Sequence, residues 1–124
     1  MSSVDLTILS WNVRGLNDAA RRELVRETTT CARPAIVCLQ ETKIDTMTPA
    51  IILESIGHRL SSYYSLDAEG TRGGVLLGWD KDVVLVTELD HRIFTISATV
   101  TVLMSNTSFR ITTCYGPADD RRNC

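Results

Sequence analysis

The sequence predicts an α/β fold in which a strand–helix–strand unit is followed by an antiparallel β-meander. Two apolar, β-prone runs, LTILSW at 6–11 and AIVCL at 35–39, flank a helical pattern over 19–31. Beyond residue 74 the pattern changes to strand-like segments separated by short turn-like groups. The length of 124 residues fits about one small domain.

The boundaries of the first unit can be assigned from local signals. Asn17 or Asp18 can cap the helix predicted over 19–31, and Pro34 ends it because proline cannot continue a helical ladder. The run at 35–39 contains no polar residue, which is typical of a strand buried on both faces. If the two strands are parallel, the connection between them is a right-handed crossover.

A short helix and a series of hairpins are expected next. Thr48 and Pro49 provide the cap and first turn of a helix over 50–55. Residues 63–74 are polar and contain glycine, so we predict a loop there. Asp90-His91 is expected to be a turn between two strands of the meander. The predicted strands of that region are 75–79, 83–88, 92–104 and 108–115.

Charge and composition restrict the functional classes. The net charge is −2 and the sequence pI is about 5.6, which argues against a protein that holds nucleic acid by charge alone. A metal-dependent nuclease stays possible because the ion supplies local positive charge. The start of the chain has no signal-peptide pattern, and no run reaches membrane-spanning length. We therefore expect an intracellular protein without membrane contact, nuclear if it acts on genomic DNA.

Polar side chains follow both predicted strands of the first unit. Asn12 comes after the first strand, and Glu41 and Lys43 come after the second. Ends of adjacent parallel strands meet at one edge of a sheet, where α/β folds bind ligands. Asn and Glu offer the oxygen atoms that Mg²⁺ prefers. The alternatives are a turn-forming asparagine and a solvated glutamate.

Four segments together resemble the endonuclease/exonuclease/phosphatase superfamily. They are SWNVRGLN at 10–17, LQETK at 39–43, RGGVLL at 72–77 and CYGP at 114–117. The resemblance implies half of a four-layer α/β sandwich, in which residues 1–124 are the N-terminal portion of a domain truncated before its second half. It also implies a magnesium-dependent phosphodiesterase, most similar to a LINE-type retroelement endonuclease that acts on DNA.

The resemblance assigns roles at the matched positions. Glu41 would bind Mg²⁺ directly, Asn12 would support the metal site, and Tyr115 would contact the scissile phosphate or orient the attacking water. Lys43 and Arg72, in loops beside the matched motifs, are predicted to contact nucleic-acid phosphate.

Arg14 indicates the subgroup. An arginine before glycine, with Leu16-Asn17 after it, resembles plant-type LINE endonucleases, and Arg14 would then bind nucleic acid. The alternative is a solvated surface charge.

The sequence also departs from the family pattern. It contains no Gly-Asp-x-Asn motif, and its one Asp-His pair, at 90–91, lies mid-chain; His58 is expected at the surface. We therefore predict that the chain alone is inactive. The resemblance implies that each half of the family fold supplies one sheet, so we expect this chain to expose an apolar sheet face through which it self-associates. The alternatives are a non-enzymatic remnant acting as a binding or dimerising module, and an unrelated α/β domain.

Overall fold

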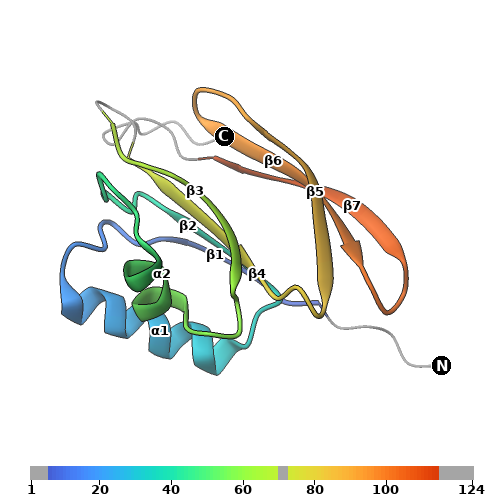
Figure 1. The fold of residues 1–124 in the computed structure, drawn as a ribbon, viewed down its shortest axis with the longest axis horizontal. Coiled ribbons are helices and arrows are strands. Elements are labelled where there is room, and N and C mark those ends of the chain that lie inside the picture. Colours follow the sequence, from blue (N-terminus) through green and yellow to red (C-terminus); the bar gives the residue numbers. More distant parts are fainter. Residues whose placement is uncertain (1–5, 70–72, 115–124) are drawn as a thin grey trace.

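The computed structural model of the chain describes residues 6–69 and 73–114, in three layers (Figure 1). Helices cover one face of a four-stranded sheet, and a three-stranded sheet covers the other. Arg72 and Tyr115 lie outside the described residues. This arrangement is the mixed α/β sandwich fragment that the sequence predicted.

The four-stranded sheet contains the strand–helix–strand unit. Its strands, in the spatial order β1-β2-β4-β3, are β1 (Ile8–Asn12), β2 (Ile36–Gln40), β4 (Val75–Trp79) and β3 (Ser62–Leu66). β1 and β2 are parallel and are joined by α1 (Ala19–Ala32), while β4 is antiparallel to both β2 and β3. The second helix, α2 (Pro49–Ile56), lies beside α1 on the same face (Figure 1).

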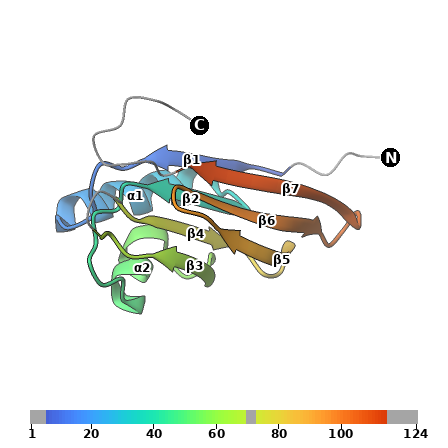
Figure 2. The same ribbon diagram turned by 90° about the horizontal axis from the view of Figure 1, so that it is seen from above.

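The three-stranded sheet is an antiparallel meander. Its strands are β5 (Val84–His91), β6 (Thr95–Val102) and β7 (Thr107–Cys114), in that spatial order. Val102 pairs with both Val84 and Thr107, which fixes the register at one end of the sheet. Figure 2 shows that β7 and β1, each at the edge of its own sheet, lie on the same side of the molecule.

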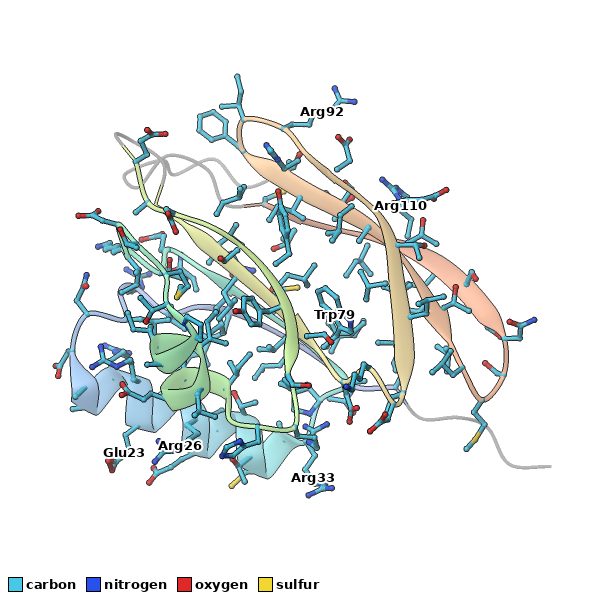
Figure 3. The ribbon with its side chains drawn as sticks, viewed as in Figure 1. Glu23, Arg26, Arg33, Trp79, Arg92 and Arg110 are labelled. Carbon is cyan, nitrogen blue, oxygen red and sulfur yellow. The ribbon has the colours of Figure 1, made fainter. Side chains whose placement is uncertain are left out.

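The central strand β2 contributes to both hydrophobic cores. Val37 and Leu39 are fully buried in the core between the sheet and the helices, with Val25 of α1. Ile36 and Cys38 face the other way and pack in the core between the sheets. Successive side chains of a strand point to opposite faces, so a continuous apolar run is needed at this position. Trp79 also points between the sheets, whereas Arg110 points outward (Figure 3).

The helix ends agree with the predicted signals. Asp18 caps α1 by accepting a hydrogen bond from the Ala20 backbone N–H at 3.0 Å. Thr48 caps α2 by accepting one from the Ile51 N–H at 3.2 Å, and Pro49 takes the first helical position. Each cap satisfies a donor that has no partner inside its helix.

The predicted loop over 63–74 is partly wrong, because Ser62–Leu66 forms strand β3. β3 is an edge strand that is only half buried, so its two serines remain near solvent. Its polar composition therefore resembles a loop, while its tyrosines favour a strand.

Two predicted turns also need correction. The group 80–82 is not a hairpin turn; it carries the chain from β4 to the other sheet, and Asp80 N–H bonds to the Ala35 carbonyl at 2.9 Å. Asp90-His91 is the last part of β5 and not a turn. The turn follows it, closed by the Arg92 N–H and the Thr95 carbonyl at 2.8 Å. His58 is exposed, as expected.

The expectation that this half supplies a single sheet with an exposed apolar face is wrong. The described residues build both sheets, and the inner faces pack on each other. The outer face of the second sheet has a polar ladder across β6 and β7: Ser97–Thr112, Thr101–Ser108 and Arg110–Thr99, at 2.8, 2.8 and 2.9 Å. Within the described part of the chain, no helix has the length and apolar character needed to cross a membrane.

Candidate metal and phosphate site

Asn12 and Glu41 meet at the edge of the sheet where β1 and β2 end. Asn12 is paired in register with Gln40, so Glu41 follows immediately beside it. The Asn12 Nδ2 group donates a hydrogen bond to Glu41 Oε2 at 2.6 Å. Asn12 Oδ1 accepts from the Arg14 backbone N–H at 3.1 Å, which fixes the orientation of the amide. Asn12 therefore presents its donor, and not its oxygen, to the carboxylate.

The segment 41–43 continues the hydrogen-bonded ladder beyond the end of β2. On the β1 side, Gly15 N–H donates to the Glu41 carbonyl at 2.7 Å and Leu16 N–H to the Thr42 carbonyl at 2.8 Å. On the β4 side, Lys43 N–H donates to the Gly73 carbonyl at 2.7 Å. The segment is thus held from both sides, which gives Glu41 a defined backbone position.

Three residues of this site have left-handed backbone conformations. Arg14, Glu41 and Lys43 have φ values of 54°, 56° and 57°. Such a conformation costs a residue with a side chain about 1–2 kcal/mol, and it persists only where the surrounding structure holds it. The ladder on both sides of residues 41–43 provides that restraint. Strain of this kind is common at functional sites, which supports the choice of these residues as candidates.

The carboxylate of Glu41 is the type of oxygen ligand that hard cations such as Mg²⁺ prefer. Glu41 is half buried, and Asn12 donates to only one of its two oxygens. Mg²⁺ is often held by one or two carboxylates together with water and substrate phosphate. Among the residues that the structure describes, no cluster of three or more acidic, histidine or cysteine side chains could hold a metal. Glu41 and Asn12 therefore fit part of a magnesium site.

Arg14 and Lys43 are exposed on the two loops that flank Glu41. Asn17 Nδ2 donates to the Lys43 carbonyl at 2.7 Å and so ties the two loops together. Both residues therefore belong to the loops that carry Asn12 and Glu41. By contrast, Glu23 and Arg33 point away from the sheet on the outer side of α1 (Figure 3).

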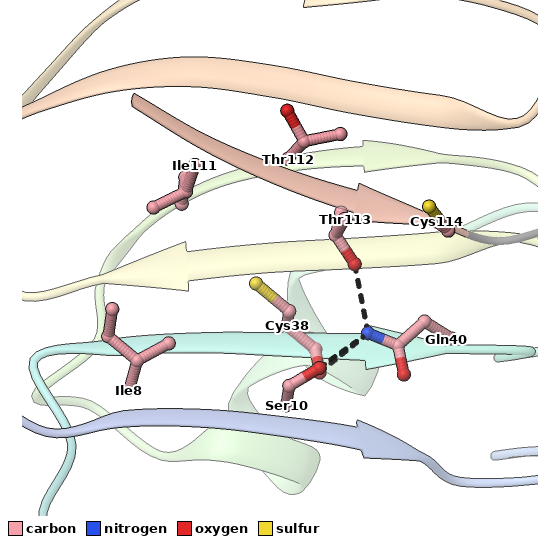
Figure 4. A pocket seen from close by; sticks show the side chains of 8 residues that line it. All are labelled: Ile8, Ser10, Cys38, Gln40, Ile111, Thr112, Thr113 and Cys114. Atoms are coloured by element: carbon pink, nitrogen blue, oxygen red, sulfur yellow. Dashed lines mark hydrogen bonds between the residues drawn. The ribbon is translucent and has the colours of Figure 1, made fainter. Parts of the chain in front are cut away.

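One polar residue of the site had no role in the sequence prediction. Gln40 points into a cleft of about 480 Å³ between β1, β2 and β7 (Figure 4). Its Nε2 group donates to Ser10 Oγ at 3.0 Å and to Thr113 Oγ1 at 2.9 Å. A glutamine that ends an otherwise apolar run was the available signal, but its partner on β7 was not predictable from spacing.

Comparison with known proteins identifies the fold. No protein-family model and no curated protein sequence matches the chain. Among solved structures, it is similar to D. rerio TDP2 complexed with a single-stranded DNA product, with a TM-score of 0.58 and 23% identity over 86% of this chain and 44% of that one. A humanized D. rerio TDP2 with 14 mutations gives a TM-score of 0.59 and 24% identity over 86% and 45%.

A third similar structure is the AP endonuclease LMAP from Leishmania major. Its TM-score is 0.58, with 16% identity over 89% of this chain and 40% of that chain. The chain thus spans less than half the length of each of these solved proteins. At these identities the likeness shows the fold alone: a mixed α/β sandwich of the kind found in these solved structures, as the motif resemblance implied.

Proposed function

We propose that this chain is part of a magnesium-dependent phosphodiesterase that cleaves DNA. The observation that carries the proposal is the hydrogen bond from Asn12 to Glu41 at paired strand ends, within a backbone segment held in a strained conformation. The shared fold with an AP endonuclease supports it. DNA is the proposed substrate class because a similar structure, that of D. rerio TDP2, holds a single-stranded DNA product.

Each residue would have a distinct task. Glu41 would hold the ion through its carboxylate, and Asn12 would keep that carboxylate oriented by donating to Oε2. A bound magnesium would supply charge neutralisation at the phosphate and at the leaving oxygen. Arg14, Lys43 and Arg72 would bind the flanking phosphates. Tyr115 would contact the scissile phosphate or orient the attacking water.

Metal binding is tested directly by titrating the chain with Mn²⁺ and following its amide resonances. We expect paramagnetic broadening around residues 12–16 and 41–43, lost in Glu41→Gln. Asn12→Ala should weaken binding at least about tenfold, because partners that orient a ligand contribute on that scale. Glu23→Gln, an exposed glutamate of α1, is the matched control. Broadening elsewhere, or unchanged in Glu41→Gln, would contradict the site.

DNA contact is tested by the salt dependence of binding in a chain that completes the domain. Arg14→Ala and Lys43→Ala should each lower affinity for all sequences and reduce the salt slope by about one. Arg33→Ala is the matched control, because Arg33 lies at the C-terminal end of α1 and points away from the sheet. Equal effects of Arg33 and Arg14 would argue against a local phosphate site.

We also propose a retroelement origin, of the LINE type, from the Arg14-Gly15 pair beside Asn12. Arg14 supports this because its side chain is exposed two residues after Asn12 in the sequence and is therefore accessible to DNA. The genomic locus tests the proposal: a reverse transcriptase in the same reading frame is expected. Intact copies that lack one would contradict it.

A second candidate is a non-enzymatic module that self-associates. It is favoured by the edges of β1 and β7, which pair with no further strand among the described residues and flank one cleft lined in part by Ile8 and Ile111. Unpaired strand edges readily add a further strand. Light scattering over a range of concentrations tests this, because association through these edges should raise the mass as concentration increases. A constant monomer mass would exclude it.

A further inference from the structure

Gln40 connects the two sheets at the end of the strand that leads into Glu41. Its donors reach Ser10 on β1 and Thr113 on β7, a residue 73 positions later in the chain (Figure 4). Thr113 is only 8% exposed, so this contact lies inside the gap between the sheets. The Thr113 hydroxyl also forms a side-chain hydrogen bond with Cys38. Gln40 thus belongs to a small polar cluster that extends from the exposed Ser10 to the buried Thr113.

We infer that Gln40 is a positioning residue for Glu41. By tying the end of β2 to β7, it fixes the distance of the end of β2 from the second sheet, and with it the position of the Glu41 carboxylate relative to Asn12. This inference rests on the proposed role of Glu41 as a metal ligand.

The directions of the restraints explain why Gln40 is needed. The ladder bonds to Gly15, Leu16 and Gly73 lie in the plane of the sheet and hold segment 41–43 sideways. They restrict movement toward or away from the second sheet only weakly. Gln40 acts in that third direction, because its side chain leaves the sheet plane and bonds across the gap. Glu41 comes next and has the strained φ of 56°, which depends on such restraint.

A second bond between the sheets provides the matched control. Tyr64 OH and His91 Nδ1 are 3.2 Å apart and link β3 to β5. β3 is separated from β2 by β4, so this bond joins the same two sheets away from Glu41. Removing it should weaken the packing of the sheets without displacing the end of β2.

The experiment compares Gln40→Met, Thr113→Val and Tyr64→Phe in the metal-free chain by amide hydrogen exchange. Gln40→Met and Thr113→Val should speed exchange of the Gly15, Leu16 and Lys43 amides about fivefold to tenfold relative to those of α1, the scale set by loss of one buried hydrogen bond. Tyr64→Phe should leave that ratio unchanged. In the double variant Gln40→Met/Thr113→Val, exchange of these amides should be faster by less than the product of the two single effects, because both substitutions remove the same contact.

Mn²⁺ affinity provides the second readout. Gln40→Met should weaken binding at the Glu41 site by a similar factor, and Tyr64→Phe should not. If the unmodified chain binds no Mn²⁺, the proposed function fails, while the exchange ratios still decide whether Gln40 positions Glu41. Equal ratios in all variants, or the same change in Tyr64→Phe, would overturn the inference. If Gln40→Met does not fold, Thr113→Val tests the same contact from β7.

Discussion

Replacing Gly74 with alanine tests whether a glycine is required where β4 begins beside the Glu41 segment. Gly74 has a φ of +86°, and a Cβ there would lie 2.5 Å from Thr42 Oγ1 and 3.2 Å from the backbone nitrogen of Ala68. Non-bonded atoms prefer about 3.5–4.0 Å. Because Thr42 is fully buried and Ala68 contributes backbone, the segment has to move to accept the methyl group.

The expected cost has two parts. The left-handed conformation costs alanine about 1–2 kcal/mol, and overpacking a buried site costs about 1–3 kcal/mol. Gly74→Ala should therefore lower the free energy of unfolding by roughly 2–5 kcal/mol. Thr42→Ala removes the hydroxyl that meets the new methyl group. That hydroxyl has no hydrogen-bond partner within the described residues, so the second substitution should recover part of the overpacking cost.

Urea unfolding followed by tryptophan fluorescence measures these energies. The control is Gly57→Ala, which also has a positive φ, of +79°, but no heavy atom within 4 Å of the added Cβ. Gly57→Ala should show only a backbone cost and should add independently to Thr42→Ala. If Gly74→Ala costs less than about 1 kcal/mol, or adds independently to Thr42→Ala, the close packing deduced from these distances is wrong.

Three further outcomes are expected. The 124-residue chain should not nick supercoiled plasmid with Mg²⁺, because one carboxylate and an amide do not complete a catalytic site; nicking that Glu41→Ala abolishes would refute this. Burial raises the pKa of Cys38 from 9.0 to about 11, partly offset by its hydrogen bond to Thr113. Because the folded chain favours the uncharged thiol, about 2–3 kcal/mol of the free energy of unfolding should be lost as the pH rises from 9 to 11. Urea unfolding of Cys38→Ala should not show this loss. An equal loss in Cys38→Ala and in the unmodified chain would contradict the raised pKa of Cys38. Thr48→Ala should cost about 1 kcal/mol through its lost cap, and an unchanged unfolding midpoint would contradict that role.

The parts of the fold with local signals were predictable from the sequence. The apolar run of β2 predicts a buried strand, and Thr48-Pro49 predicts the start of a helix, each from only a few adjacent residues. β3 was missed because an edge strand does not need apolar residues on both faces. The end of β5 was missed because a bulge at Thr87–Asp90, where Glu88 has a φ of 54°, interrupts the alternation of the strand.

The only part of the candidate site that could be predicted is the part whose residues follow two strands that are neighbours in the sheet. Asn12 and Glu41 follow two strands that pair in parallel, so their proximity depends on one local unit. The contact of Gln40 with Thr113 depends on how two sheets pack, and no spacing in the sequence contains that information. The catalytic roles of these residues, and those of Arg72 and Tyr115, stay predictions.

The contact between Gln40 and Thr113 forms late during synthesis, because Thr113 lies 73 residues after Gln40. A nascent chain that has emerged as far as Trp79 already holds all four strands of the first sheet and both helices. The face of that sheet with Ile36 and Cys38 then remains open until β5, β6 and β7 follow. During this interval Gln40 lacks its partner on β7, and the exposed apolar strip is a target for chaperones or for aggregation. Asn12 and Glu41 are therefore synthesised early, but the contact from Gln40 to β7 can form only after β7 has left the ribosome.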